Sequence, residues 1–188
     1  VYHVRRPAIP GQCPSHVTLR VRRGLPSLRS RRFLRELRTS LRESCERSGF
    51  RVVHYSVQGN HLHLLVESAG KAALGRGMKS ISARVARAVQ RVFGVTGPIL
   101  HGRYHLRVLR TPREVRNALA YVLLNARKHW RERHAAAPPL RLDEASSGRW
   151  FGGWRLAGGS REPPRRLTAA QAVAGKQDGG EMPQVAGP

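Results

Sequence analysis

Two histidines one residue apart, His61 and His63, lie inside the run HLHLLVE, which otherwise reads as a buried strand. Side chains of a strand alternate between its faces, so both imidazoles fall on one face while Leu62, Leu64 and Val66 fall on the other. Two adjacent imidazoles backed by a core can form a metal site, whereas a histidine pair at the start of a strand can also face solvent and be inert. Imidazole alone favours Zn, Cu or Ni, because Mg and Mn prefer oxygen ligands.

A second pair of polar side chains, Tyr121 and Asn125, lies four residues apart in a segment with helical periodicity, so the two should project together. A tyrosine hydroxyl has a reference pKa of about 10 and becomes a nucleophile at neutral pH only with a partner that stabilises charge. Each residue alone also fits a structural role, the tyrosine as a core or rim aromatic and the asparagine as a surface residue. The spacing of residues in the sequence does not identify a side chain that would act as general base.

The elements that would position these residues alternate along the chain. The expected strands are 16–22, 50–57, 61–67 and 99–110, and the expected helices are 30–48, closed by Gly49, 71–93, and one that begins after Thr111. Thr111, Pro112 and Glu114 form the signature of a capping box at the start of that last helix. Gln58, Gly59 and Asn60 are typical of a tight hairpin loop between the middle strands.

This order, β-α-β-β-α-β, predicts an α+β fold of the ferredoxin-like, split βαβ type. We expect an antiparallel sheet with helices on one face, plus an additional C-terminal helix that carries the tyrosine. Residues 1–14 read as an irregular N-terminal arm and 15–137 as the folded domain that holds the histidine pair and the tyrosine. Residues 138–188, rich in Gly and Pro, read as a low-complexity, disordered tail.

The charge of the chain indicates a polyanionic partner. Lys and Arg number 35 against 11 Asp and Glu, a formal net charge of +24, and only four of the basic residues are lysines. Arginine can donate two hydrogen bonds to one phosphate and can stack on bases, so nucleic acid is the first partner to consider. A GC-rich genome would explain part of the arginine excess. The expected DNA contacts are Arg20, Arg22, Arg84, Arg87, Arg91, Arg103 and Arg107.

The number of cysteines and the hydropathy of the chain indicate the cellular compartment in which the protein is expected. Only Cys13 and Cys45 are present, without the spacing of a zinc cluster or a disulfide framework. No apolar run approaches the roughly 20 residues of a membrane span, and no segment resembles a secretion signal. We therefore expect a soluble protein of the cytoplasm.

Three stretches, HVTLRVRRGLPSLR, GNHLHLLVE and RYHLRVLRTPREVRNALAYVLLNARKHW, together resemble the HUH single-strand transposases, most closely the REP-associated tyrosine transposases of bacteria. The resemblance spans residues 16–130 and includes the His-hydrophobic-His motif and the helix that carries the nucleophilic tyrosine. The chain departs from the family pattern at Gly59 and Ala126, where proline is common. Ala126 lets the last helix run on to Trp130 or beyond.

The resemblance implies a metal-dependent single-stranded DNA endonuclease and strand transferase that acts on hairpin or repeat DNA. Tyr121 would form a 5′-phosphotyrosine, and His61, His63 and Asn125 would bind Mg²⁺ or Mn²⁺. Three protein ligands leave coordination positions open for phosphate oxygens. Such a protein would associate with the bacterial nucleoid when bound to DNA.

Two other readings remain open. One is a non-catalytic DNA- or RNA-binding module on the same fold, although the aromatic signature of an RRM is absent. The other is a rolling-circle replication initiator or relaxase, which usually carries larger domains. Whether the chain is a monomer or a homodimer is undecided.

Overall fold

The computed structural model describes residues 13–42, 46–47, 49–133 and 142–153. Five strands, three α-helices and one short 3₁₀ helix lie within these ranges. In chain order the elements are β1 (Ser15–Arg20), α1 (Arg31–Arg42), β2 (Glu46–Arg47), β3 (Phe50–Val57), β4 (His61–Ser68), α2 (Lys71–Phe93), β5 (His105–Val108), α3 (Pro112–Arg133) and η1 (Gly148–Trp150).

The strands form one antiparallel sheet in the order β2-β3-β4-β1-β5. The short β2 extends one edge, and the other strands have the order of a split βαβ unit, with β1 and β4 in the centre. The register of these central strands places Thr18 opposite His63 and Arg20 opposite His61. The predicted α+β, ferredoxin-like class is therefore confirmed.

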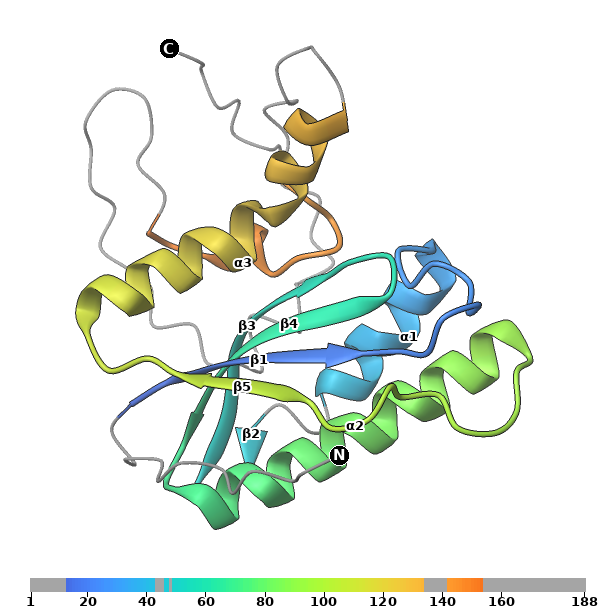
Figure 1. The fold of residues 1–188 in the computed structure, drawn as a ribbon, viewed down its shortest axis with the longest axis horizontal. Coiled ribbons are helices and arrows are strands. Elements are labelled where there is room, and N and C mark those ends of the chain that lie inside the picture. Colours follow the sequence, from blue (N-terminus) through green and yellow to red (C-terminus); the bar gives the residue numbers. More distant parts are fainter. Residues whose placement is uncertain (1–12, 43–45, 48, 134–141, 154–188) are drawn as a thin grey trace.

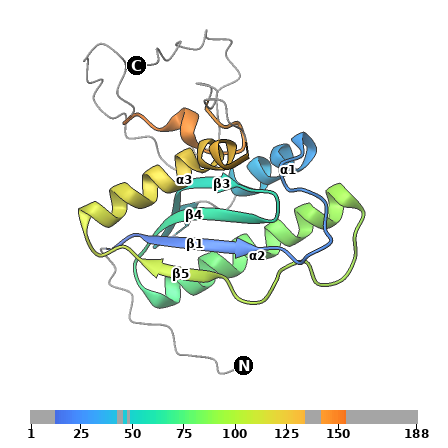
Figure 2. The same cartoon turned by 45° about the horizontal axis from the view of Figure 1, so that its top comes forward.

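The sheet separates two apolar layers. α1 and α2 cover one face, and α3 lies across the other (Figures 1 and 2). The main core joins α1 and α2 to sheet residues such as Leu64, whereas a smaller cluster joins Leu65 to Ala118 and Val122 of α3. Leu64 and Leu65 are neighbours on β4, so their places in different clusters follow from the alternation of the strand.

The first helix is shorter than its periodicity predicts, and the expectation that it reaches residue 48 is wrong. α1 ends at Arg42, and Glu46–Arg47 pair with the start of β3. Gly49, expected to close the helix, instead lies in the turn between β2 and β3 with a φ of +71°, a conformation that glycine adopts without strain. Pairing with a sheet edge satisfies backbone groups in a way that helical periodicity alone does not reveal.

The last strand is also shorter than expected. β5 covers His105–Val108, and earlier in the predicted strand only Leu100 bridges to Val21. Gly102, with a φ of +66°, interrupts the extended backbone between the two paired parts.

The remaining boundaries agree with the sequence to within two residues, the largest difference being at β1, which ends at Arg20 rather than at residue 22. α2 occupies the predicted range, and the capping box of α3 is formed. The backbone N–H of Glu114 donates to Thr111 Oγ1 at 3.2 Å, and the N–H of Thr111 donates to the Glu114 carboxylate at 3.2 Å. Because alanine at position 126, unlike proline, does not interrupt a helix, α3 continues to Arg133, as its sequence predicts.

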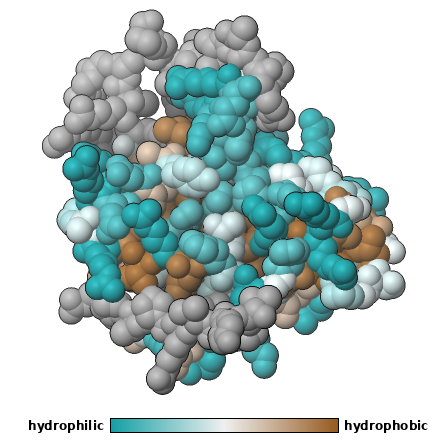
Figure 3. Space-filling view, viewed as in Figure 1, coloured by the Kyte–Doolittle hydropathy of each residue, from teal (hydrophilic) through white to brown (hydrophobic). Residues whose placement is uncertain are grey.

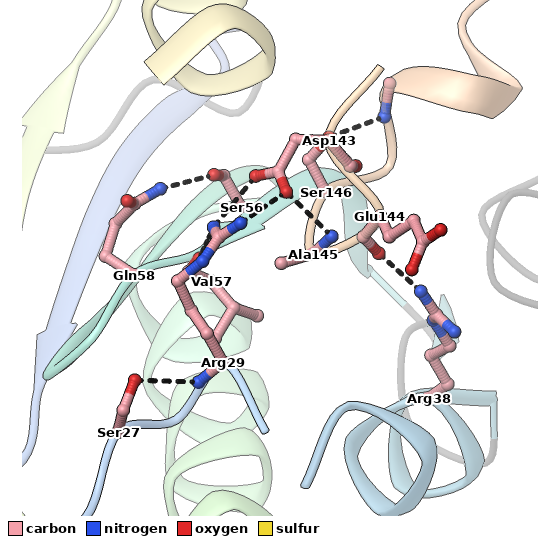
Figure 4. Close-up of polar contacts among 11 residues, drawn as sticks. Ser27, Arg29, Arg38, Ser56, Val57, Gln58, Asp143, Glu144, Ala145 and Ser146 are labelled. Carbon is pink, nitrogen blue, oxygen red and sulfur yellow. Dashed lines mark hydrogen bonds and ion pairs between the residues drawn. The ribbon is translucent and has the colours of Figure 1, made fainter. Parts of the chain in front are cut away.

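Residues 142–153, which we call the edge segment, correct the expected extent of the tail. The backbone of Ala145 and Ser147 bonds to Val57 and Tyr55 along the edge of β3 that β2 leaves unpaired. Asp143 forms two hydrogen bonds, of 2.6 and 3.0 Å, with Arg29 (Figure 4). This stretch belongs to the folded domain, and its low-complexity composition hides that role because its contacts are made by backbone groups and by a few small polar side chains.

Several expectations fall on residues outside those that the structure describes. They concern residues 1–12 of the arm, Cys45, and residues 134–141 and 154–188 at the end of the domain and in the tail. Within the described ranges, no helix has the length and apolar character needed to cross a membrane.

Candidate active site

His61 and His63 project from β4 toward the face of the sheet that α3 covers. Leu62 and Leu64 lie on the opposite face in the main core, as the alternation predicts. The Nε2 atoms of the two histidines are 3.1 Å apart, and their rings are nearly perpendicular, at 85°. The two imidazoles therefore turn the same ring nitrogen toward one common point.

Two residues of β1 complete this cluster, and the sequence reasoning did not single them out. His16 Nε2 lies 3.1 Å from His63 Nδ1, and Thr18 Oγ1 lies 3.2 Å from the same atom. Both residues share a strand face with Arg20, at alternate positions of β1. That alternation was visible in the sequence, but only the pairing of β1 with β4 shows that it faces the histidines.

Tyr121 stands over this cluster from α3. Its ring centroid is 5.1 Å from that of His63 and 5.8 Å from that of His16, with edge-on geometry in both cases. The side chain is 41% exposed, so its hydroxyl is accessible to a large substrate. Lys128 Nζ lies 5.8 Å from the ring centroid and places a positive charge on the same side of the helix.

Asn125 lies one helical turn after Tyr121 and is 1% exposed. Among the residues that the structure describes, neither its Oδ1 nor its Nδ2 has a hydrogen-bond partner. A buried amide without partners is costly and calls for an explanation, and a cation bound by Oδ1 would supply one. Two imidazole nitrogens aimed at one point and an amide oxygen without a partner fit a divalent metal ion in donor number and type.

Among the residues that the structure describes, no group of three or more His, Cys, Asp or Glu side chains is arranged to hold a metal ion. The candidate set of His61, His63 and Asn125 includes an amide and so is of a different type.

Burial keeps the histidines of the site neutral. It lowers the pKa of His63 to about 3, with further lowering by the charges of His61, His16 and His129. Burial is also the main cause of the lowered pKa of His61, followed by the charge of Arg20, and of the lowered pKa of His16. Neutral imidazoles keep a lone pair, which a metal ligand requires.

The predicted DNA-binding arginines divide into two groups. Arg20 and Arg107 act electrostatically on His61 and His16, so they border the site, and Arg22 and Arg103 are exposed in the adjoining loops. Figure 3 shows mainly hydrophilic residues over the end of α3 in this view.

The second group lies on α2, on the other face of the sheet, and the structure does not bring it to the site. It consists of Arg84, Arg87 and Arg91. Arg91 is paired with Glu36 of α1, so at least one member of the group has a structural role.

A pocket of about 350 Å³ lies elsewhere, between α3 and the edge segment. Its lining includes Arg31, Leu123, Arg127 and Trp130. The α3 residues among these face away from the side of the helix that carries Tyr121 and Asn125. The candidate site therefore does not coincide with this pocket.

Comparison with known proteins gives a family for the first part of the chain. The family model described as "Transposase IS200 like" matches residues 11–102, which include His61 and His63 but end before α3. No curated protein matches the chain.

One solved structure supports the fold. A REP-associated tyrosine transposase bound to a REP hairpin is 19% identical, with a TM-score of 0.52 over 69% of this chain and 74% of that chain. A candidate transposase from Deinococcus radiodurans R1 is 15% identical, with a TM-score of 0.43 over 72% of this chain and 98% of that chain.

Proposed function

We propose, on the premise that this chain belongs through residues 11–102 to the IS200-like transposase family, that it cleaves and rejoins single-stranded DNA through a covalent phosphotyrosine. One observation carries the proposal: Tyr121, which lies outside the matched segment, stands 5.1 Å from the ring of His63, which lies inside it. A nucleophile and a pair of metal-binding side chains from distant parts of the chain thus meet on one accessible surface.

The chemical step begins at Tyr121. Its Oη attacks the phosphorus of a phosphodiester and loses its proton, and the Oη–P bond forms as the bond from phosphorus to the 3′ oxygen breaks. That oxygen gains a proton and leaves as a 3′-hydroxyl, while the 5′ phosphate stays on the tyrosine. Because one phosphoester bond replaces another, attack by a 3′-hydroxyl reverses the step and joins strands.

His61, His63 and Asn125 would hold Mg²⁺ or Mn²⁺. When bound, the cation would neutralise phosphate oxygens and orient the phosphorus for in-line attack. The observations that support this assignment are the lowered pKa values of both histidines and the exposure of Tyr121 beside His63.

Hairpin or repeat DNA is the proposed substrate, because the similar REP-associated tyrosine transposase is bound to a REP hairpin. Arg20 and Arg107, at the border of the site, would contact phosphates of the strand that passes Tyr121. A net charge of +24 supports binding to such a polyanion.

The test is cleavage of labelled single-stranded hairpin DNA, drawn from repeats that flank the gene, with Mg²⁺ or Mn²⁺. The natural chain is compared with Tyr121→Phe, which removes only the hydroxyl, and with His61→Ala. His101→Ala, at an exposed histidine in the loop before β5, serves as the matched control.

We expect the natural chain and His101→Ala to cut the DNA and to become covalently attached to it. Tyr121→Phe and His61→Ala should bind the hairpin without cutting it. If all four chains bind equally and none cuts any of the repeats, the protein is a non-catalytic DNA-binding module and the proposed enzyme is wrong.

A further inference from the structure

Each of the two histidines has a polar partner on the ring nitrogen that points away from their common point. For His61 this nitrogen is Nδ1, 2.8 Å from Asn60 Oδ1. For His63 it is also Nδ1, with Thr18 and His16 as neighbours. These partners decide which nitrogen of each ring carries the proton.

The proton of His61 has one possible position. An amide oxygen only accepts hydrogen bonds, so Nδ1 of His61 must donate to Asn60 Oδ1. A neutral imidazole has a single ring proton, and therefore Nε2 of His61 carries a lone pair. This lone pair points at His63.

His63 can carry its proton on either nitrogen. Without a cation, its Nε2 must donate to the lone pair of His61, because two lone pairs 3.1 Å apart would repel each other. Its Nδ1 then accepts from Thr18. With a cation at the common point, Nε2 of His63 must also offer a lone pair, and its proton must move to Nδ1 and find an acceptor there.

The hydroxyl of Thr18 serves both states, since it donates in the first and accepts in the second. Thr18 lies directly opposite His63 in the β1–β4 register, so the backbone holds this hydroxyl in place. The ring of His16, with one donor and one acceptor nitrogen, is a second partner of the same kind.

We propose that Asn60 and Thr18, with His16 in support, are positioning residues that set the protons of His61 and His63 so that both Nε2 atoms can face one cation. The inference deepens the proposed function and rests on it for the identity of the ligand. Partners of metal-bound histidines commonly alter metal affinity by 10- to 100-fold.

The experiment uses a matched pair of full-length chains, His16→Phe/Thr18→Ser and His16→Phe/Thr18→Val. Phenylalanine removes the second partner in both, so His63 Nδ1 faces a hydroxyl in the serine chain and only methyl groups in the valine chain. Divalent-ion affinity is measured with Mg²⁺ in competition with Mn²⁺ detected by electron paramagnetic resonance. Equal thermal unfolding midpoints without metal show that both chains fold.

We expect the valine chain to bind the ion about 10- to 100-fold more weakly than the serine chain, because a buried Nδ1–H of His63 would lack an acceptor. Equal affinities in the pair would overturn the role of Thr18.

A metal-free measurement separates this inference from the proposed function. Ring ¹⁵N chemical shifts of the natural chain should show His61 protonated at Nδ1, and Asn60→Leu should redistribute that proton between the two nitrogens. A natural chain with the proton on Nε2 of His61 would overturn the inference. A natural chain with the expected tautomer that binds neither ion would instead remove the metal from the proposed function.

Discussion

The ring of Tyr121 meets the ring of His63 edge-on, with 5.1 Å between centroids and 77° between planes. The first residue belongs to α3 and the second to β4, so the rotation of α3 on the sheet sets the distance from the proposed nucleophile to the proposed metal ligands. Asn125, on the same face of α3, is buried, and neither of its amide atoms has a hydrogen-bond partner among the residues that the structure describes. This polar group is therefore one that the described part of the fold does not satisfy.

Replacing Asn125 with leucine should separate stability from activity. Leucine removes the unpartnered amide, so the metal-free protein should gain on the order of 1 kcal/mol in unfolding free energy. The same variant should lose divalent-ion affinity and metal-dependent cleavage. Urea unfolding and ion titration measure the two effects.

Asn117→Leu is the control, because this asparagine is exposed on the same helix. It should change neither quantity appreciably. If Asn125→Leu binds the ion as tightly as the natural chain, Asn125 is not a ligand.

The ion pair of Asp143 and Arg29 should anchor the edge segment. The Asp143 side chain is 7% exposed, and Arg29 also donates to the Val57 carbonyl at 2.9 Å. Asp143→Asn should cost about 1–3 kcal/mol, since the nearly buried carboxylate loses its charge-assisted bonds to Arg29. Faster hydrogen exchange at the amides of Tyr55 and Val57 should accompany the loss.

Glu67→Gln provides a comparison, because its pair with Arg51 has side chains 46% and 43% exposed. An exposed pair contributes less than about 1 kcal/mol. Equal losses in the two variants would mean that the Asp143 pair contributes no more than a surface contact.

His54 should make the protein sensitive to acid. Its Nδ1 lies 3.1 Å from Ser147 Oγ, and burial lowers its pKa to about 4. The unfolded chain, with an ordinary histidine pKa of about 6.5, binds more protons between these values. Stability contributed by neutral His54 is thus complete above pH 6.5 and falls as the pH drops toward 4, by on the order of 3 kcal/mol.

The measurement is unfolding free energy against pH for the natural chain and His54→Gln. The glutamine variant should show a shallower decline between pH 6.5 and 4, although the other buried histidines still contribute. Parallel curves would show that His54 takes up a proton without unfolding.

Two glycines of α2 should respond oppositely to alanine. A Cβ at Gly77 would lie 2.3 Å from the buried ring of Phe50, whereas one at Gly75 would meet nothing within 4 Å. Gly77→Ala should therefore destabilise the fold by about 1–3 kcal/mol through overpacking. Gly75→Ala should stabilise it by about 0.5–1 kcal/mol through helix propensity. Thermal unfolding of both variants tests this, and a stabilising Gly77→Ala would contradict the packing of α2 on β3.

Much of the architecture was determined by local sequence. The range of α2, the capping box of Thr111 and Glu114, and the hairpin before His61 depend on periodicity and turn chemistry within a few residues. The alternation of His61 and His63 with leucines fixed the face of the strand on which they lie, for the same local reason. Ala126, which continues a helix where proline would interrupt it, likewise predicted the length of α3.

Tertiary structure determined the contacts between residues that are distant in the chain, which no local sequence pattern contains. Residues 46–47 continue a helical sequence pattern but pair with β3 in the structure. The edge segment also pairs with β3, in part through backbone hydrogen bonds, which do not depend on side-chain type. His16 and Thr18 became partners of His63 only through the β1–β4 register, since a register joins residues that are distant in the chain. The sequence alone determined which side chains could do chemistry, and the packing of α3 on the sheet decided which of them meet.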